Sequence, residues 1–193
     1  SWAQGAAAAA LNIYREALGF CQRLMAIKPP NMCWQRDSGV TLGRMGHALF
    51  DQGDLTGAHT SYRAALAIFP RLAAADPSHV LWQRDLSVAH RSLADVLRAQ
   101  GDLNGALKAY QQSLAISQRL ATADSTHLGR QRNLSNCYDK VARVQHARGD
   151  LLGALDAYKE SLRIRQQVAA ADPTNLDCQR DLSFSYESLA YVH

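Results

Sequence analysis

The sequence predicts an all-α protein built from stacked helix pairs, and three observations predict it. Short motifs recur at a fixed period of 48 residues, which is typical of stacked copies of one supersecondary unit. Apolar residues within each copy fall at three- and four-residue spacing. No stretch alternates long enough to favour a strand. The recurring motifs are Gly-Asp-Leu at 53–55, 101–103 and 149–151, tyrosine at 14, 62, 110 and 158, and Gln-Arg-Asp or Gln-Arg-Asn at 35–37, 83–85, 131–133 and 179–181.

The composition excludes several classes of protein. The 193 residues are 47% hydrophobic, which is ample for a core, and no apolar run reaches the roughly 18 residues needed to span a bilayer. The net charge of +4 and the pI near 9.0 are only a mild basic bias. The four cysteines share no repeat position and form no Cys-x-x-Cys, so we expect no disulfide framework or zinc site but reduced thiols in a cytoplasmic protein. The start lacks a charged-then-apolar pattern, so we expect no targeting peptide.

The first two predicted helices cover about residues 6–26 and 32–51, where apolar residues keep helical spacing. Residues 1–5 align with the end of a preceding helix and its turn, because Gly5 stands 48 residues before Gly53. Lys28, Pro29 and Pro30 are expected to end the first helix.

The third predicted helix covers residues 55–75. Gly53 lets the chain turn with a positive φ, and Asp54 is expected to cap the helix. Pro70 removes the hydrogen bond to the carbonyl of Leu66, which predicts a kink or an early end there.

The remaining helices repeat this plan. Asp76 and Pro77 suit an N-cap followed by a first-turn proline, and Asp172 and Pro173 are expected to open the last helix in the same way. The further predicted ranges are 81–99, 103–123, 128–147, 151–171 and 173–193. Small residues such as Gly46, Ala94 and Ala142 are expected to let helices approach closely, so that a leucine there costs about 1–3 kcal/mol.

One unit carries a recurring set of bulky, small and aromatic residues at His90, Leu93, Ala94, Leu97, Gly101, Ala106, Tyr110 and Leu114. At this spacing, the set resembles the signature of the tetratricopeptide repeat. The resemblance implies a right-handed superhelix of antiparallel helix pairs. The family repeat is about 34 residues long, so this chain is similar to its long-helix members, such as kinesin light chains and lengthened bacterial arrays. The implied organisation is a single solenoid of a second helix at 1–28, repeats at 29–76, 77–124 and 125–172, and a first helix at 173–193.

In the resembled family, the first helix of each pair lines a concave groove that takes extended peptides or helices. Carried over by position, this implies peptide-binding candidates at Arg44, His47, Arg91, Asp95, Arg98, Asn136, Lys140, Arg143, Phe184, Glu187 and Tyr191. The same register includes Val40, Gly43, Asp51, Val88, Ser92, Asp139, His146 and Ser188. These predicted groove residues tilt basic, which favours an acidic partner segment with an apolar anchor. The alternative is a solvated face with no dedicated ligand.

Four arginines occupy one repeat position and define an arginine ladder: Arg36, Arg84, Arg132 and Arg180. Their guanidinium groups could capture an acidic peptide or a phosphate. Alternatively, each pairs with an aspartate of its own or a neighbouring unit, such as Asp76, Asp124 or Asp172. We favour the structural interpretation, because all four copies carry the arginine.

The sequence therefore predicts a protein–protein interaction scaffold that forms part of a larger bacterial protein. No catalytic signature or cofactor fingerprint appears, so we expect no enzyme and no cofactor. One alternative is a regulatory or oligomerisation domain that acts on its own parent chain or self-associates through open helix ends. A helical-repeat nucleic-acid binder is the less favoured alternative, and no membrane partner is expected.

Overall fold

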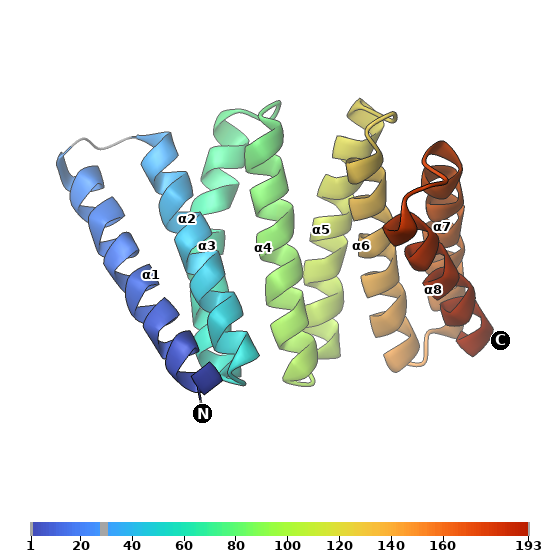
Figure 1. Ribbon diagram of the computed structural model, residues 1–193, viewed down its shortest axis with the longest axis horizontal. Coiled ribbons are helices and arrows are strands. Elements are labelled where there is room, and N and C mark those ends of the chain that lie inside the picture. Colours follow the sequence, from blue (N-terminus) through green and yellow to red (C-terminus); the bar gives the residue numbers. More distant parts are fainter. Residues whose placement is uncertain (1, 28–30, 193) are drawn as a thin grey trace. The chain divides into compact units, whose positions relative to one another are not determined.

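The computed structural model describes residues 2–27 and 31–192, and all regular structure within them is helical (Figure 1). The helices are α1 (Trp2–Ile27), α2 (Met32–Asp51), α3 (Leu55–Ala75), α4 (Val80–Ala99), α5 (Leu103–Ala123), α6 (Leu128–Ala147), α7 (Leu151–Ala171) and α8 (Leu176–Val192). The all-α prediction is confirmed. The starts of α3, α5 and α7 lie 48 residues apart, and so do those of α2, α4, α6 and α8.

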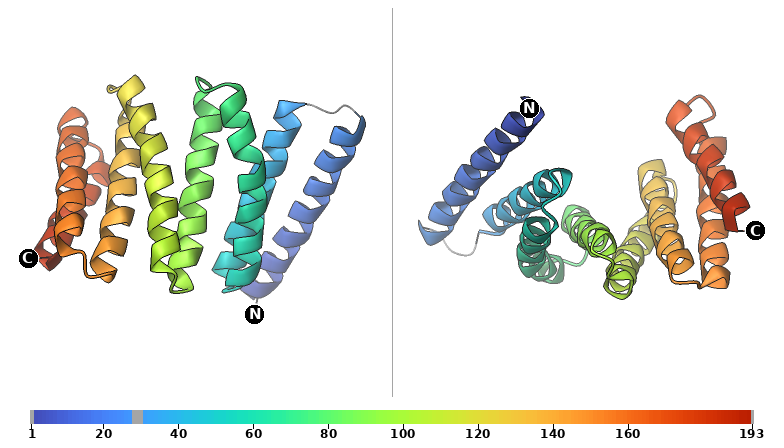
Figure 2. Two further views of the ribbon diagram at one scale, coloured as in Figure 1. Left: turned by 180° about the vertical axis from the view of Figure 1, so that it is seen from behind. Right: turned by 90° about the horizontal axis from the view of Figure 1, so that it is seen from below.

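Contacts group the helices into two units, α1–α4 and α5–α8, which divide between Asp102 and Leu103. Within each unit, helices that follow one another in the chain pack side by side and run in opposite directions (Figures 1 and 2). In the first unit, α2 also contacts α4, so the first helices of two neighbouring pairs touch directly.

Glycine and aspartate set the short turns between paired helices. Gly53, Gly101 and Gly149 have φ values of +81°, +84° and +82°, a region that costs other residues about 1–2 kcal/mol. The Asp54 carboxylate accepts a hydrogen bond from the backbone N–H of Gly57 at 2.8 Å, which confirms the predicted cap. Asp150 caps α7 in the same way, through the N–H of Gly153 at 3.0 Å.

The Asp-Pro pairs end helices rather than start them, so the predicted N-caps at Asp76 and Asp172 are wrong. Asp76 is the C-cap of α3, and its carboxylate accepts hydrogen bonds from the Ser78 hydroxyl at 2.6 Å and the Ser78 N–H at 2.9 Å. These bonds hold the pKa of Asp76 below its ordinary value. The helix that follows begins only at Val80, after the N-cap His79. Asp172 is likewise the C-cap of α7.

Two predicted helix limits are also wrong. The helix α3 continues through Pro70 to Ala75, so the predicted early end is wrong. Proline removes one hydrogen bond, but the next turn buries Leu72 to 1% exposure, and this packing keeps the helix intact. The helix α1 already begins at Trp2, so the turn predicted at residues 1–5 is wrong over the described positions. The stop predicted at residues 28–30 lies outside the described residues.

Each unit has its own apolar core. In the first unit, Ala58 and Tyr62 of α3 pack with Leu93 and Val96 of α4. In the second unit, the buried cluster contains Ala121, Leu134, Ile164, Val168, Ala169 and Cys178. The small residue at Gly46 lets α2 and α3 approach closely. A Cβ at this position would lie only 2.6 Å from the ring of Tyr62.

Candidate functional site

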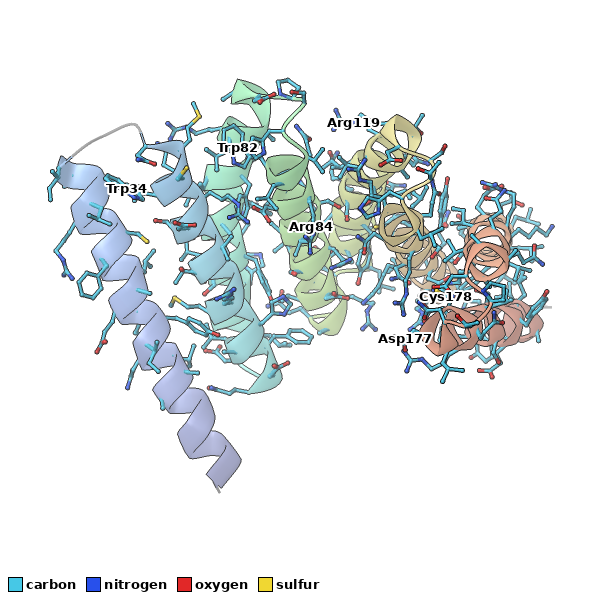
Figure 3. The ribbon with its side chains drawn as sticks, turned by 45° about the horizontal axis from the view of Figure 1, so that its top comes forward. Trp34, Trp82, Arg84, Arg119, Asp177 and Cys178 are labelled. Carbon is cyan, nitrogen blue, oxygen red and sulfur yellow. The ribbon has the colours of Figure 1, made fainter. Side chains whose placement is uncertain are left out.

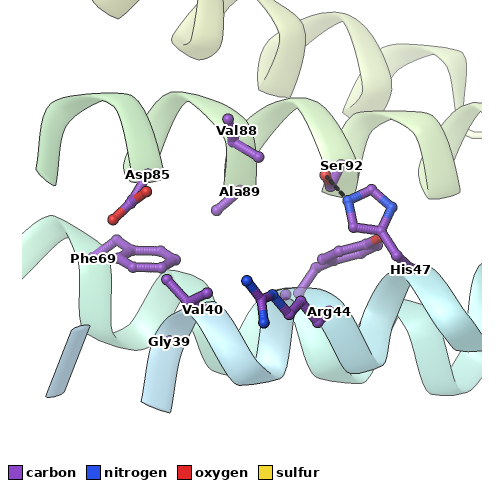
Figure 4. A pocket seen from close by; sticks show the side chains of 11 residues that line it. Gly39, Val40, Arg44, His47, Phe69, Asp85, Val88, Ala89 and Ser92 are labelled. Atoms are coloured by element: carbon purple, nitrogen blue, oxygen red, sulfur yellow. Dashed lines mark hydrogen bonds between the residues drawn. The ribbon is translucent and has the colours of Figure 1, made fainter. Parts of the chain in front are cut away.

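Three helices of the first unit, α2, α3 and α4, line an open pocket of about 220 Å³, which we call the α2–α4 pocket (Figure 4). Its lining residues are Gly39, Val40, Gly43, Arg44, His47, Tyr62, Phe69, Asp85, Val88, Ala89 and Ser92. Six of the predicted groove residues therefore lie together, from two separate helices: Val40, Gly43, Arg44, His47, Val88 and Ser92.

Two glycines of α2 line this pocket, and the space beside them differs. Phe69 packs against Gly39 so closely that a Cβ there would lie 2.8 Å from the ring. Gly43 lies one turn further along α2, and a Cβ at that position would meet nothing within 4 Å. Phe69 thus takes the space beside the first glycine, while the space beside the second stays open.

The polar groups of the pocket lie mostly at one end (Figure 4). The Arg44 side chain is exposed, and among the described residues no acidic side chain pairs with it. His47 places its Nε2 3.5 Å from the Ser92 hydroxyl, and its ring meets the Tyr62 ring edge-on at 5.5 Å. Burial raises the pKa of Tyr62 to about 12, so this phenol stays neutral at physiological pH.

At the other end of the pocket, Asp85 forms an ion pair with Arg36. Arg36 Nε donates to Asp85 Oδ2 at 2.6 Å, which links α2 to α4. The same contact recurs in the second unit, where Arg132 Nε donates to Asp181 Oδ2 at 2.6 Å and links α6 to α8. This bond raises the pKa of Arg132.

The arginine ladder therefore pairs with the aspartate of the following Gln-Arg-Asp motif in these two cases. The partners named from the sequence are wrong: Asp124 pairs with Arg130 at 3.4 Å, and Asp76 and Asp172 form the loops described above. Arg84 is exposed near the start of α4 (Figure 3). Arg180 is 73% exposed and pairs with Asp177 of its own helix at 3.0 Å.

The second unit fills the position that the first unit leaves open. Gly43 and Phe69 correspond, 96 residues later, to Asp139 and Arg165. Arg165 is only 5% exposed and forms an ion pair with Asp139. Its guanidinium also donates to the Ser185 hydroxyl at 2.7 Å and to Asn136 Oδ1 at 3.0 Å. Asn136, a predicted groove residue, is thus engaged within the fold.

The sequence reasoning missed Arg165. A signal was present, because the same repeat position carries Cys21, Phe69 and Ser117 in the other copies. An arginine that replaces small or apolar residues at a core register must find an acid or remain uncompensated. That acid could have been sought among the neighbouring helices.

Other predicted groove residues of the second unit contact one another across α6 and α8. The Arg143 guanidinium lies 4.9 Å from the Phe184 ring centroid, and the His146 and Tyr191 rings lie 5.2 Å apart. The Lys140 ammonium lies 5.9 Å from the Tyr110 ring centroid. Glu187 is exposed. On α4 of the first unit, Arg91 and Asp95 are half-buried and Arg98 is exposed, and none of these three lines the α2–α4 pocket.

A tryptophan lies near the start of α2 and of α4, Trp34 and Trp82 respectively (Figure 3). The ring of Trp82 stacks on that of the N-cap residue His79, with centroids 4.0 Å apart. Within the described residues there is no cluster of three or more histidine, cysteine, aspartate or glutamate side chains that could hold a metal ion. No helix in that same part of the chain is long and apolar enough to cross a bilayer.

Comparison with known proteins finds a family match over part of the chain. No curated protein matches the chain. Similar solved structures include BtubC (BKLC) from P. vanneervenii, at 12% identity over 97% of this chain and 89% of that chain, with a TM-score of 0.45. MamA is 14% identical over 93% of this chain and 88% of its own, with a TM-score of 0.45. Residues 84–167 match the family model of the tetratricopeptide repeat. This matched segment contains the signature residues of one unit, from His90 to Leu114, so residues 84–167 are similar to the tetratricopeptide repeat.

Proposed function

We propose that this chain binds a peptide or a helical segment of a partner protein along the predicted groove residues of its first helices, as part of a larger protein. Tetratricopeptide repeats support an interaction scaffold in general terms. The observation that carries the finer proposal is the α2–α4 pocket, because six predicted groove residues on two helices converge on one hollow. Interaction sites of this kind are recognised by an apolar cavity with a few convergent polar groups.

Exposed arginines give these faces their charge preference. Arg44 and Arg98 are exposed on α2 and α4, and Arg143 is exposed on α6. A guanidinium binds a carboxylate through two parallel hydrogen bonds, which gives both affinity and orientation. The preferred partner is therefore a segment that carries aspartate or glutamate side chains.

The test is affinity capture from a lysate of the source cells, with quantification of each captured protein. We expect the double variant Arg44→Glu/Arg143→Glu to lose its specific partner by at least tenfold, because both substitutions place a carboxylate where the partner's own carboxylates would lie. The matched control is Arg63→Glu/Arg119→Glu, which makes the same charge change at exposed positions on the second helices α3 and α5. Equal capture by the two double variants would refute the groove assignment.

Self-association is a second candidate, and the exposed face of α1 favours it. Ile13 and Phe20 are 63% and 60% exposed, whereas Ile164, which occupies the register of Phe20 in α7, is 2% exposed. On α8, Ala190 is exposed, whereas Ala142 at the same register of α6 is fully buried. The α8 helix of one copy could therefore pack on α1 of the next copy as α2 packs on α3.

Sedimentation velocity across a range of protein concentrations tests this candidate. We expect the wild-type chain to form larger species as concentration rises, and Phe20→Glu to remain monomeric, because it places a charge in the proposed apolar contact. Leu152→Glu is the control, since Leu152 is 78% exposed on α7 and lies outside that contact. A wild-type chain that stays monomeric at every concentration would exclude self-association.

A further inference from the structure

We propose that the α2–α4 pocket holds one aliphatic or aromatic side chain of the partner peptide, and that Arg44 pairs with a carboxylate next to that side chain. This inference rests on the proposed function, which it deepens by naming the chemistry of the partner segment.

The size of the pocket sets the size of the occupant. A dry apolar cavity of about 150 Å³ accepts benzene, so the 220 Å³ of this pocket suffices for one leucine, methionine or phenylalanine side chain. Sites for drug-sized ligands and cofactors run from about 300 to 1,000 Å³. The pocket therefore fits a single anchoring side chain rather than a whole cofactor.

The inner wall selects an apolar group. Val40, Phe69, Val88 and Ala89 converge on the hollow from three helices (Figure 4). The polar atoms beside them already have partners, because Asp85 is bound by Arg36 and Ser92 contacts His47. An apolar side chain can enter without leaving Asp85 or Ser92 unpaired, whereas a polar side chain would lose its water against this apolar wall.

The mouth selects the carboxylate. Arg44 lines the pocket, is exposed, and has no acidic partner among the described residues. The negative charge of Asp85 does not oppose an incoming carboxylate strongly, because Arg36 compensates it at 2.6 Å. An aspartate or glutamate beside the anchoring residue completes the charge balance at Arg44.

Comparison of the two units explains why the first unit holds this pocket. At the positions of Gly43 and Phe69, the second unit has Asp139 and Arg165, whose buried ion pair occupies the corresponding space. The two units thus share the same repeat positions, but a glycine leaves space at one position in the first unit, whereas a buried ion pair occupies it in the second.

A titration with short peptides, followed by backbone amide shifts in NMR spectra, tests the proposal. The probes are five-residue peptides with a single leucine, phenylalanine or alanine between two aspartates. We expect the leucine and phenylalanine peptides to shift the amides of Val88 and Ala89 and to bind at least tenfold more tightly than the alanine peptide. Replacing the aspartates of the peptide by asparagine is expected to weaken binding to the wild type, but not to Arg44→Gln.

The decisive variant is Gly43→Leu, which fills the pocket from within. A Cβ at this position meets nothing within 4 Å, so the variant is expected to fold, and its melting temperature checks this. We expect it to bind the leucine peptide at least tenfold more weakly than the wild type does. Gly19→Leu is the control, since it adds a leucine to α1, where the Cβ meets only Arg23 at 3.8 Å.

Several results would overturn the proposal. Unchanged binding by Gly43→Leu would place the peptide elsewhere, and equal binding of leucine and alanine peptides would remove the anchor. If 4-methylpentanoate alone bound as tightly as the peptide, the site would serve a free small acid. The proposed function has a separate test. If Arg44→Glu/Arg143→Glu still captures the partner, the groove assignment is rejected. If Gly43→Leu still captures the partner but Arg44→Glu/Arg143→Glu does not, only the pocket proposal is rejected.

Discussion

Replacing Arg165 by methionine is expected to lower the free energy of unfolding by about 3–5 kcal/mol, because it leaves a buried aspartate without its counter-ion. Arg165 and Asp139 are both 5% exposed, and their ion pair joins α6 to α7. Arg165 also donates to the Asp181 carbonyl at 3.0 Å and to the Ser185 hydroxyl at 2.7 Å, which ties α8 to the same centre. Loss of the arginine therefore removes contacts from three helices at once.

Urea denaturation followed by circular dichroism measures this effect, and two further variants sharpen it. Arg163→Met removes an exposed arginine of the same helix, which pairs with Glu160 at 2.9 Å, and should cost less than about 1 kcal/mol. The double variant Arg165→Met/Asp139→Leu should recover most of the lost stability. Asp139 Oδ1 and Arg165 Nε have no hydrogen-bond partner, so the native pair is itself incompletely satisfied. A stability of Arg165→Met within about 1 kcal/mol of the wild type would contradict this account.

Most of the helices could be predicted from the sequence because local signals set their limits. The ranges Leu55–Ala75, Leu103–Ala123 and Leu151–Ala171 follow directly from the Gly-Asp-Leu motif and the apolar spacing. The glycine adopts a positive φ, and the aspartate caps the next helix through a hydrogen bond three residues away. Such interactions lie within a few residues of one another, so a short stretch of sequence determines them.

The wrong boundaries arose where local signals competed with packing. An aspartate before a proline suits either a helix start or a loop, and Asp76 bonds to Ser78 in the loop form. Proline within α3 removes one hydrogen bond, but the burial of Phe69 and Leu72 on either side outweighs it. Neither result could be reached without knowing which face of the helix is buried.

The candidate site was predicted only in part, for the same reason. Its positions on α2 and α4 were carried over from the groove of the resembled family, and Arg44 and His47 both line the pocket. The hollow depends on Gly43, Phe69 and Ala89, which lie on three helices and meet only after folding. Whether a register position is open or filled depends on pairs such as Asp139 and Arg165, which are 26 residues apart in the chain.

Gly46→Leu is expected to destabilise the chain by about 1–3 kcal/mol, because the added side chain has no room. A Cβ at Gly46 would lie 2.6 Å from Cε1 of Tyr62, and the Tyr62 ring is itself 2% exposed and fixed among Ala58, Leu93 and Val96. The helices α2 and α3 must therefore separate, or the tyrosine must leave its core position. A thermal melt, together with the near-ultraviolet signal of tyrosine, reports both changes.

Gly43→Ala, three residues earlier on the same helix, provides the matched contrast. Its Cβ meets nothing within 4 Å, and replacing a mid-helix glycine by alanine stabilises a helix by roughly 0.5–1 kcal/mol. The two substitutions should therefore move the melting temperature in opposite directions, although both add a side chain to a glycine of α2. Destabilisation by both would mean that α2 tolerates no side chain on this face and that the space beside Gly43 is closed in solution. Opposite shifts would separate a glycine that the helix contact requires from one that keeps the pocket open.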